Sequence, residues 1–414
     1  MHQPLNVTIV GGGIAGLAAA RVLREHHHVT VLEKFPGGHE VGAALNMGPT
    51  AVKIAEQLGF DRVKCRSVAA SCCNTFNKDG QQIHHMDMAP FQKFSRADWL
   101  FQHRADLWNE WLRLATISSE ELGISGRPAE VQWGADVLNV DVETGSVQLA
   151  DGRTIMSDLV VGADGIRSVV RPLVVGEEEY RTARPSGSSA FRFMLAAEEV
   201  HVICGDMPIL DSTKAASLDI YLPLDGTNRS IVMYPCRNFD ALNFVAIVPD
   251  SMLKRQTLES WTASGDRDDL LRCFDDFGPH IKNLLKHADD VRLWQLRDQD
   301  PLPTYVKGRT VLIGDSAHAM TPHQGQGGTQ SIEDAEGFSL FNRPNISRET
   351  VPNILKDFER VRRSRASKIQ DITREAHERK SPEQMFKHNL YNWTYPGIHK
   401  CLQNLNDGKE MIAI

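Results

Sequence analysis

The sequence lacks the features that direct a chain to a membrane, to an oxidising compartment or to nucleic acid. No stretch reaches the roughly 18 uninterrupted apolar residues of a membrane-spanning helix, and the first residues have no basic segment leading into a signal-peptide core. The seven cysteines form neither a disulfide framework nor zinc-binding spacing. A net charge of -7 argues against a nucleic-acid partner, because a phosphate backbone attracts clustered lysine and arginine. We expect a cytoplasmic protein with no transmembrane segment and no metal site.

What is present indicates a globular protein with more than one compact unit. Of the 414 residues, 41% are hydrophobic and 24% are charged, which suits a chain with a sizeable core. Residues 6–10 predict a strand, residues 14–23 a helix and residues 29–32 a second strand. Residues 98–123 have helical spacing, whereas residues 186–250 indicate successive strands. The sequence therefore predicts an α/β chain with a β-rich region inserted into it.

The strongest local pattern is a glycine-rich turn between the first predicted strand and helix. Gly11 permits the tight turn, Gly13 lets the backbone approach a pyrophosphate, and Gly16 allows close packing of helix on sheet. Glu33 ends the next predicted strand, where an acid accepts a hydrogen bond from a ribose hydroxyl. This combination predicts dinucleotide binding rather than a purely structural turn, and it leaves NAD and FAD open.

Later motifs distinguish between the two nucleotides. The segments Ala163–Arg171 and Gly314–Gly328 each follow a predicted strand. Together with His103–Leu107, Tyr234 before a proline and Trp294, they make the sequence resemble the class A FAD-dependent aromatic hydroxylases, particularly the salicylate hydroxylase branch. The resemblance covers nearly the whole chain and implies that FAD is the bound nucleotide.

Motifs of other flavoenzyme classes are absent. There is no Trp-x-Trp-x-Ile-Pro segment, which disfavours a flavin halogenase. A second GxGxxG is missing, so two-dinucleotide reductases and Baeyer–Villiger enzymes are disfavoured. No Cys-x-x-Cys follows the glycine turn, so a disulfide reductase is excluded. NADH or NADPH is then expected to bind transiently, without a Rossmann unit of its own.

The resemblance implies an α/β fold in which a Rossmann-type FAD-binding domain carries an inserted β-sheet substrate domain and a C-terminal helical segment. We expect the FAD-binding domain to comprise residues 1–75, 98–180 and 294–350, the substrate domain residues 76–97 and 181–293, and the helical region residues 351–414.

The resemblance also assigns cofactor contacts. Arg104 would pair with the FAD pyrophosphate, the alternative being a surface arginine. Asp315 would accept from ribityl hydroxyls. Asp164, with Gly165, would contact FAD and NAD(P)H, the alternative being an ordinary turn. Four further residues would open a helix whose N–H groups stabilise negative charge on the reduced flavin. These residues are Gly325, Gln326, Gly327 and Gly328.

The implied activity is that of a monooxygenase. NADH or NADPH would reduce FAD, and O2 would give a C4a-hydroperoxyflavin that hydroxylates an aromatic substrate, either phenolic and salicylate-like or a natural-product intermediate. Two alternatives stay open: epoxidation or oxidative rearrangement of a polycyclic or indole substrate, and a non-catalytic FAD-binding redox or interaction protein. We expect a monomer or homodimer.

The substrate site is the least determined part. Arg192 is the first candidate to hold a substrate carboxylate or phenolate or to guard flavin movement, and a structural ion pair is its alternative. Tyr234 could donate to a substrate oxygen or be a core tyrosine, and Pro322 is expected beside the flavin face. The weaker substrate-binding candidates are Asn46, Tyr221 and His201. Of these, Asn46 cannot act as a base.

Overall fold

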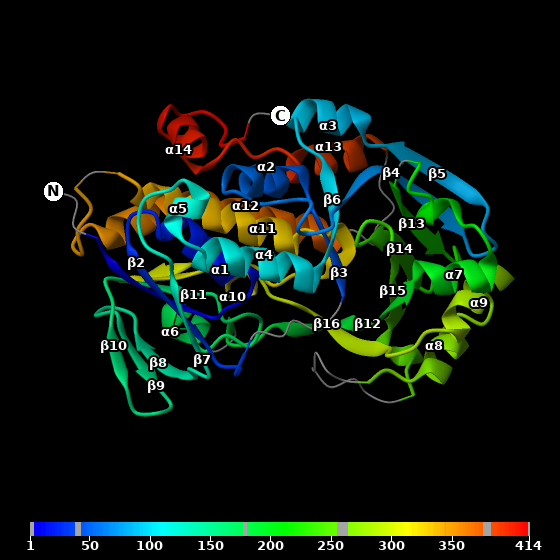
Figure 1. Ribbon diagram of the computed structural model, residues 1–414, viewed down its shortest axis with the longest axis horizontal. Coiled ribbons are helices and arrows are strands. Elements are labelled where there is room, and N and C mark those ends of the chain that lie inside the picture. Colours follow the sequence, from blue (N-terminus) through cyan, green and yellow to red (C-terminus); the bar gives the residue numbers. More distant parts are fainter. Residues whose placement is uncertain are drawn as a thin grey trace.

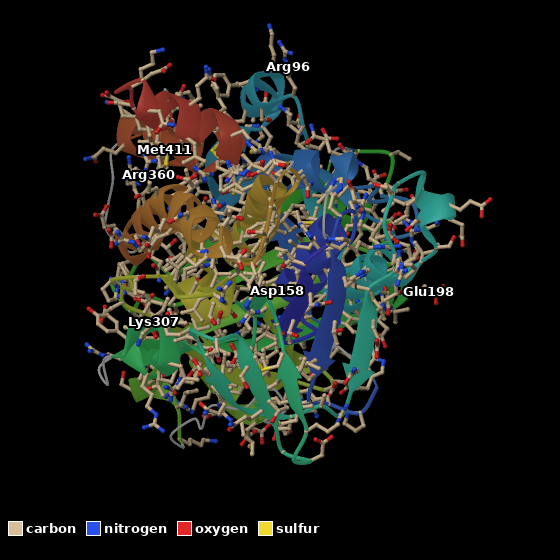
Figure 2. The ribbon with its side chains drawn as sticks, turned by 90° about the vertical axis from the view of Figure 1, so that its left-hand side faces the viewer. Arg96, Asp158, Glu198, Lys307, Arg360 and Met411 are labelled. Carbon is tan, nitrogen blue, oxygen red and sulfur yellow. The ribbon has the colours of Figure 1, made fainter. Side chains whose placement is uncertain are left out.

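The computed structural model describes residues 4–37, 43–176, 180–214, 216–254, 264–343, 345–375 and 382–412. These residues form three sheets with helices packed between and around them (Figure 1). Exposed charged side chains such as Arg96 and Lys307 lie at the surface (Figure 2). The fold is the α/β class that the sequence predicts, with a Rossmann-like sheet, a strand-rich second sheet and helices at the C-terminus.

The first sheet carries the nucleotide-binding topology. Its strands are parallel apart from one edge, where β17 runs antiparallel to β18. The central strands are short apolar runs, as expected for strands covered on both faces. In sheet order the described strands are β17 (Val306–Lys307), β18 (Thr310–Leu312), β11 (Leu159–Gly162), β1 (Asn6–Val10), β2 (His28–Glu33) and β7 (Glu130–Trp133).

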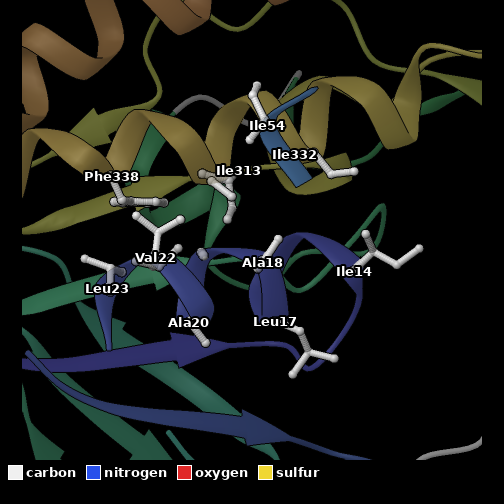
Figure 3. Close-up of a cluster of buried hydrophobic side chains, with 14 of the residues drawn as sticks. Ile14, Leu17, Ala18, Ala20, Val22, Leu23, Ile54, Ile313, Ile332 and Phe338 are labelled. Carbon is white, nitrogen blue, oxygen red and sulfur yellow. The ribbon is translucent and has the colours of Figure 1, made fainter. Parts of the chain in front are cut away.

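Helix α1 (Ile14–Leu23) packs between this sheet and α11 (Gly327–Gly337). Figure 3 shows Val22 pointing towards Phe338, at the end of α11, while Leu17 and Ala20 point to the opposite side of α1. All four of these side chains are buried, and the small residues in α1 let its neighbours approach closely. The glycine turn that precedes α1 is therefore anchored by a packed core.

The second and larger sheet is antiparallel except where β13 runs parallel to β4. It combines strands from distant parts of the chain, and β5 pairs with β4 beside β6. In sheet order the described strands are β16 (Arg292–Asp298), β12 (Arg184–Ala196), β15 (Ala241–Pro249), β14 (Ser230–Cys236), β13 (Ala216–Leu222), β4 (Val68–Asn77), β6 (Trp99–His103) and β3 (Ala44–Met47), with β5 (Gln82–Asp87) on β4.

The two faces of this sheet are covered differently. Phe191, Tyr221 and Met233 belong to the cluster beneath the outer helices, on the right in Figure 1. Their neighbours in sequence, Arg192 and Ile220, line a cavity on the opposite face. Successive side chains of a strand point to opposite faces, so this alternation decides which residues can reach the cavity. The covering helices are α7 (Ala197–Cys204), α8 (Arg267–Cys273) and α9 (Pro279–Lys286).

The remaining elements complete the frame. A small antiparallel sheet contains β8 (Val137–Asp141), β9 (Ser146–Leu149) and β10 (Thr154–Met156). The other α-helices are α2 (Pro49–Gln57), α3 (Ala89–Ser95), α4 (Arg104–Thr116), α5 (Ser119–Leu122), α6 (Arg171–Val175), α10 (Asp315–His318), α12 (Val351–Arg374), α13 (Pro382–Asn392) and α14 (Ile398–Asn406).

Several elements differ from the sequence-based expectation. Residues 98–123 are not one helix, because β6 precedes α4 and pairs with β3 and β4. The segment 186–250 contains helix α7 as well as strands. The larger sheet also crosses the expected domain limits, since β3 and β6 belong to it and residue 294 falls within β16. Local spacing could not reveal these long-range strand pairings.

A buried ion network joins α11 to α12. Glu333 of α11 accepts from Arg362 at 2.8 Å and from Arg365 at 2.5 and 2.8 Å, and it also receives the Thr50 hydroxyl at 2.7 Å. The neighbouring Asp334 accepts from Arg362 Nε at 2.8 Å. Both carboxyl groups are buried, and burial alone would raise their pKa values. Against this effect, Arg365 and Arg362 hold the pKa of Glu333 below its usual range, and His318 and Arg362 do the same for Asp334.

Replacing Glu333 tests this network. Glu333→Ala leaves Arg365 buried without a carboxylate partner, so we expect the free energy of unfolding to fall by about 3 to 5 kcal/mol. The measurement is denaturant unfolding of the FAD-free protein. Asp151→Ala is the control, because the Asp151–Arg153 pair is about half exposed and its loss should change stability little. Equal effects of the two changes would contradict a structural role for the network.

Candidate active site

One cavity of about 880 Å³ separates the two large sheets. Its lining includes Gly13 after β1, Gly165 after β11 and Asp315 after β18. These three strands are parallel, so their carboxyl ends open at the same edge of the sheet, which is where α/β folds bind ligands. The opposite wall is the inner face of the larger sheet. The cavity therefore joins a nucleotide-binding edge to a second, apolar surface.

The three glycines of the turn have different tasks. Gly11 has a φ of +107°, and a Cβ there would lie 2.3 Å from the Ala163 carbonyl oxygen. A Cβ on Gly16 would lie 2.1 Å from the Gly11 carbonyl oxygen. At Gly13 a Cβ would meet nothing within 4 Å, and this residue faces the cavity. Gly11 and Gly16 permit the turn, whereas Gly13 keeps space for a ligand.

Glu33 holds the same turn from the end of β2. Its carboxylate accepts the Gly12 N–H at 2.7 Å and the Phe35 N–H at 3.0 Å. Glu33 is not among the residues that line the cavity. Its binding of a ribose hydroxyl stays a prediction.

Two helix N-termini open into the cavity without a side-chain cap. Helix α1 begins after Gly13, and α11 begins after Gln326. Unpaired N–H groups and the positive end of the helix dipole at both places favour an anion or a negatively charged ring. Gly327 and Gly328 in the first turn of α11 keep this backbone accessible from the cavity.

Asn46 of β3 supports the loop before α11. Gly325 has a φ of +60°, and a Cβ there would lie 2.4 Å from the Asn46 amide. The Asn46 Oδ1 accepts from Trp99 Nε1 at 3.1 Å, and Asn46 lines the cavity. Asn46 therefore packs against the glycine loop, and its direct contact with substrate stays a prediction.

Asp164 stabilises the turn after β11. Its two carboxylate oxygens accept the Ser168 hydroxyl at 2.5 Å and the N–H groups of Val169 and Val170 at 2.7 and 3.2 Å. Burial raises the pKa of Asp164, which these hydrogen bonds oppose. Asp164 does not line the cavity, whereas Gly165 does. The contact of Asp164 with FAD and NAD(P)H stays a prediction.

Arg171 connects the two cofactor loops, a role that the sequence reading did not assign. The buried guanidinium donates to the carbonyl oxygens of Asp315 and Ser316, each at 2.7 Å, and to that of Ile166 at 3.0 Å. Its position at the end of the Ala163–Arg171 motif is the signal that could have identified it. Arg171 thereby places the Asp315 carboxylate at the cavity edge.

The loop before Asp315 is also held from behind. Asp334 accepts the Gly314 N–H at 2.8 Å and a hydrogen bond from His318 Nε2 at 2.6 Å. Both side chains are fully buried. The buried network between α11 and α12 therefore extends directly to the cofactor edge.

Arg192 and Tyr234 project into the cavity from β12 and β14. The guanidinium carbon of Arg192 lies 4.3 Å from the centre of the Trp294 ring, and its Nε has no hydrogen-bond partner among the described residues. Burial lowers the pKa of Arg192 to about 10, the Tyr234 hydroxyl raises it and Arg104 lowers it. Burial raises the pKa of Tyr234, and Arg192 opposes that rise. The pair presents a cation and a neutral donor at neutral pH.

The rest of the larger sheet gives the cavity an apolar wall. Trp99, Trp393 and Pro322 also line the cavity, with the rings of the two tryptophans 5.8 Å apart. The wall itself consists of aliphatic side chains that share one face of β13, β14 and β15, namely Leu218, Ile220, Val232, Val245 and Ile247.

Two predicted substrate contacts lie elsewhere. Tyr221 is buried on the opposite face of the sheet, where its ring stacks on Phe76 at 4.9 Å. His201 lies on the outer helix α7. Its side chain is 65% exposed, and its Nδ1 lies 2.9 Å from Asp206 Oδ1. Strand alternation turns the Tyr221 side chain away from the cavity. His201 belongs to a helix that covers the far face of the sheet. Neither prediction is retained.

Sequence reading missed a further wall of the cavity at the C-terminus. His388, Asn389, Asn392 and Trp393 all line it. Their spacing of three to four residues places them on one side of α13 and its end. That spacing was visible in the sequence, but nothing local indicated which surface this side would contact.

The cavity edge fits FAD. Gly13 leaves open space beside an uncapped helix, as a pyrophosphate needs, and Arg104 and Asp315 lie at the same edge. Around this edge Arg171 and Asp334 hold the backbone in place. Gly13, Arg104 and Asp315 would hold the nucleotide and ribityl chain, with the ring system beside Gly327 and Gly328.

Comparison with known proteins agrees with this assignment. The family described as FAD binding domain matches residues 4–373. Hispidin-3-hydroxylase of Neonothopanus nambi is 32% identical over 377 residues, covering 88% of this chain and 86% of that protein. A salicylate hydroxylase of Pseudomonas putida is 30% identical over 423 residues, covering 94% and 92%.

Solved structures give the same result. A salicylate hydroxylase substrate complex has a TM-score of 0.70 at 26% identity, covering 98% of this chain and 93% of that one. CtdE in complex with FAD has a TM-score of 0.74 and covers 98% and 100%, and at 21% identity this likeness concerns the fold alone.

The chain belongs to the FAD binding domain family, in its salicylate hydroxylase-like branch of class A flavoprotein hydroxylases. It is an FAD-dependent monooxygenase that uses NAD(P)H and O2. This sets aside the non-catalytic alternative. Within the described part of the chain, no helix has the length and apolar character to span a membrane, and no cluster of His, Cys, Asp or Glu could hold a metal ion.

The glycine turn provides a paired test of cofactor binding. Gly13→Val adds a side chain in open space, so we expect a folded protein that does not retain FAD. Gly16→Ala puts a methyl group 2.1 Å from a carbonyl oxygen, so we expect it to lower stability even without FAD. Flavin absorbance per protein and thermal unfolding of the FAD-free proteins separate the two effects. Full flavin content in Gly13→Val would contradict the placement of the nucleotide.

Proposed function

We propose that this enzyme hydroxylates the ring of a phenolic aromatic substrate that extends over more than one ring. The observation that carries the proposal is the pairing of Arg192 and Tyr234 with a long apolar wall in the same cavity. The relatives named above are, by name, hydroxylases of hispidin and salicylate. The Arg192–Tyr234 pair suits a phenol, and the wall suits a larger ring system.

The length of the wall supports a substrate larger than salicylate. Arg192 of β12 and Met86 of β5 both line the cavity, and five strand-to-strand steps separate these strands. Adjacent strands lie about 4.8 Å apart, so the wall extends on the order of 20 Å. Between these two residues the wall is mainly aliphatic, which favours a neutral conjugated body over a second charged group.

Arg192 and Tyr234 would act on the substrate oxygen. A phenol oxygen beside the guanidinium has its ionised form stabilised, which makes the ring more electron-rich. The Tyr234 hydroxyl, whose pKa is raised, stays protonated and can donate to the same oxygen. Because the buried Arg192 Nε has no hydrogen-bond partner among the residues that the structure describes, binding an oxygen there also satisfies this donor.

The rest of the cavity would protect the reaction. FAD, when bound and reduced by NADH or NADPH, would activate O2 so that one oxygen atom is transferred to the substrate and the other leaves as water. The apolar face of the sheet and the paired tryptophans, Trp99 and Trp393, exclude water from this region. The uncapped N-terminus of α11 would stabilise negative charge on the reduced ring system.

The cellular setting is part of the proposal. All seven cysteines are free thiols, which supports a reducing compartment such as the cytoplasm. A monomer or homodimer stays a prediction, which size-exclusion chromatography with light scattering would test.

A substrate screen tests the proposed activity. The FAD-loaded enzyme should oxidise NADH or NADPH faster in the presence of hispidin than of salicylate, with a product 16 mass units heavier, as insertion of one oxygen atom requires. Oxygen consumption and product mass spectrometry are the measurements. A preference for salicylate would contradict the extended-substrate assignment, and no stimulation by any phenol or other aromatic would contradict the activity.

Arg192 can be tested against a matched control. Arg192→Ala should lower kcat/KM for product formation by about 10- to 100-fold while FAD stays bound, because a charged hydrogen bond to the substrate oxygen is lost. Tyr234→Phe should act in the same direction, whereas Tyr221→Phe, on the other face of the sheet, should not. The ratio of product formed to NAD(P)H consumed is measured for each variant. Unchanged turnover in Arg192→Ala would exclude it from the reaction.

A further inference from the structure

Helix α13 forms a polar surface at one end of the cavity. The Asn389 Nδ2 lies 3.5 Å from the sulfur of Met86 on β5, and the ring of Phe386 lies 5.3 Å from that of Phe91 on α3. These contacts agree with Figure 1, where α13 lies next to α3 near the upper end of the larger sheet. The end of the cavity beside β5 is therefore closed by a helix that is far in sequence from every cofactor motif.

The amide groups of this helix are only partly satisfied. The contact of Asn389 with Met86 is to a thioether, a weak acceptor, and the Asn389 Oδ1 has no hydrogen-bond partner among the described residues. Asn389 is half-buried and lines the cavity, so its oxygen is accessible there. Asn392 is buried. Its Nδ2 donates to Gln324 Oε1 at 2.6 Å, while its Oδ1 has no hydrogen-bond partner among the described residues. The more exposed amide of Asn389 is thus available to a ligand, and the buried amide of Asn392 connects the helix to the cofactor loop.

The position of α13 is fixed by the buried ion network. Arg365 donates to the carbonyl oxygens of Tyr391 and Asn392, each at 3.1 Å, at the end of the helix. The same guanidinium is paired with Glu333 of α11. Because α11 also begins at Gly327, the polar surface and the cofactor loop are held by one helix.

We propose that Asn389 is a specificity-determining residue, whose amide oxygen accepts a hydrogen bond from a hydroxyl at the far end of an extended aromatic substrate. Asn392 is a positioning residue that aligns this end of α13 through Gln324. This inference rests on the proposed function for the class of substrate. A hydroxyl suits the site, because a ligand without one leaves the amide oxygen desolvated and unpaired.

Three distyrylbenzenes that differ at one position provide the probe, because their length is comparable to that of the wall. They are 1,4-bis(4-hydroxystyryl)benzene, 1-(4-hydroxystyryl)-4-styrylbenzene and 1-(4-hydroxystyryl)-4-(4-methoxystyryl)benzene. Their dissociation constants are measured from the change in flavin fluorescence of the oxidised, FAD-loaded enzyme. We expect the dihydroxy compound to bind about five- to tenfold more tightly than the other two. In Asn389→Leu, which keeps the number and branching of the side-chain heavy atoms, this preference should disappear while the affinity for the monohydroxy compound changes by less than about twofold.

Two further variants complete the experiment. Lys387→Ala lies on the same helix with an exposed side chain and should keep the full preference. Asn392→Ala should weaken binding of the dihydroxy compound without removing FAD. A wild-type enzyme that binds the three compounds equally or not at all, or an Asn389→Leu variant that keeps the preference, would overturn the inference. These titrations need no NAD(P)H and no turnover. A negative result would therefore contradict the role of Asn389 without contradicting aromatic hydroxylation, and a negative substrate screen would contradict the hydroxylation without deciding the role of Asn389.

Discussion

The pairing of Glu333 and Asp334 with Arg362 and Arg365 is the constraint on which the rest of the site depends. These four ionised side chains are buried away from solvent, so each needs an oppositely charged partner. Removing one of them leaves a buried charge unpaired and destabilises the fold. Their hydrogen bonds extend outward, through Asp334 to the Gly314 N–H and through Arg365 to the end of α13. The cofactor edge and the C-terminal wall of the cavity are therefore fixed relative to each other by the same helix, α11.

The two sides of the cavity are built by different means. At the cofactor edge, we expect backbone groups to bind FAD, namely the N–H groups of uncapped helix N-termini beside Gly13, which leaves open space. Such a site recognises a phosphate or a charged ring largely through its backbone, and Arg104 and Asp315 are the side chains expected to add to it. On the sheet side, alternate residues of β12, β13, β14 and β15 form the wall, and each can be exchanged without altering the strand pairing. This division allows one cofactor site to serve enzymes with different substrates.

Electrostatics within the cavity follow the same division. Arg171 donates to five backbone carbonyl groups and so contributes to loop geometry. Arg192 instead lies over the Trp294 ring, its buried Nε has no hydrogen-bond partner in the described part of the chain, and burial lowers its pKa, which the charge of Arg104 lowers further. An oxygen that carries negative charge is favoured at this point of the cavity, whereas the aliphatic wall beyond it favours an uncharged body. This asymmetry supports the proposed orientation of an extended substrate, with its phenol oxygen towards Arg192.

The sequence by itself determined the cofactor half of this protein. Gly11, Gly13 and Gly16, and the strand and helix around them, were predictable because a tight turn depends on neighbouring residues and on the absence of a Cβ. The tertiary structure alone decided the substrate half. Tyr221 and His201 are excluded by the face of the sheet on which they lie, and Asn389 is brought to the cavity by contacts with residues about 300 positions earlier. Strand alternation fixes two faces but does not say which of them meets the cavity, since that depends on long-range pairing and on the buried charges that hold α11, α12 and α13 together.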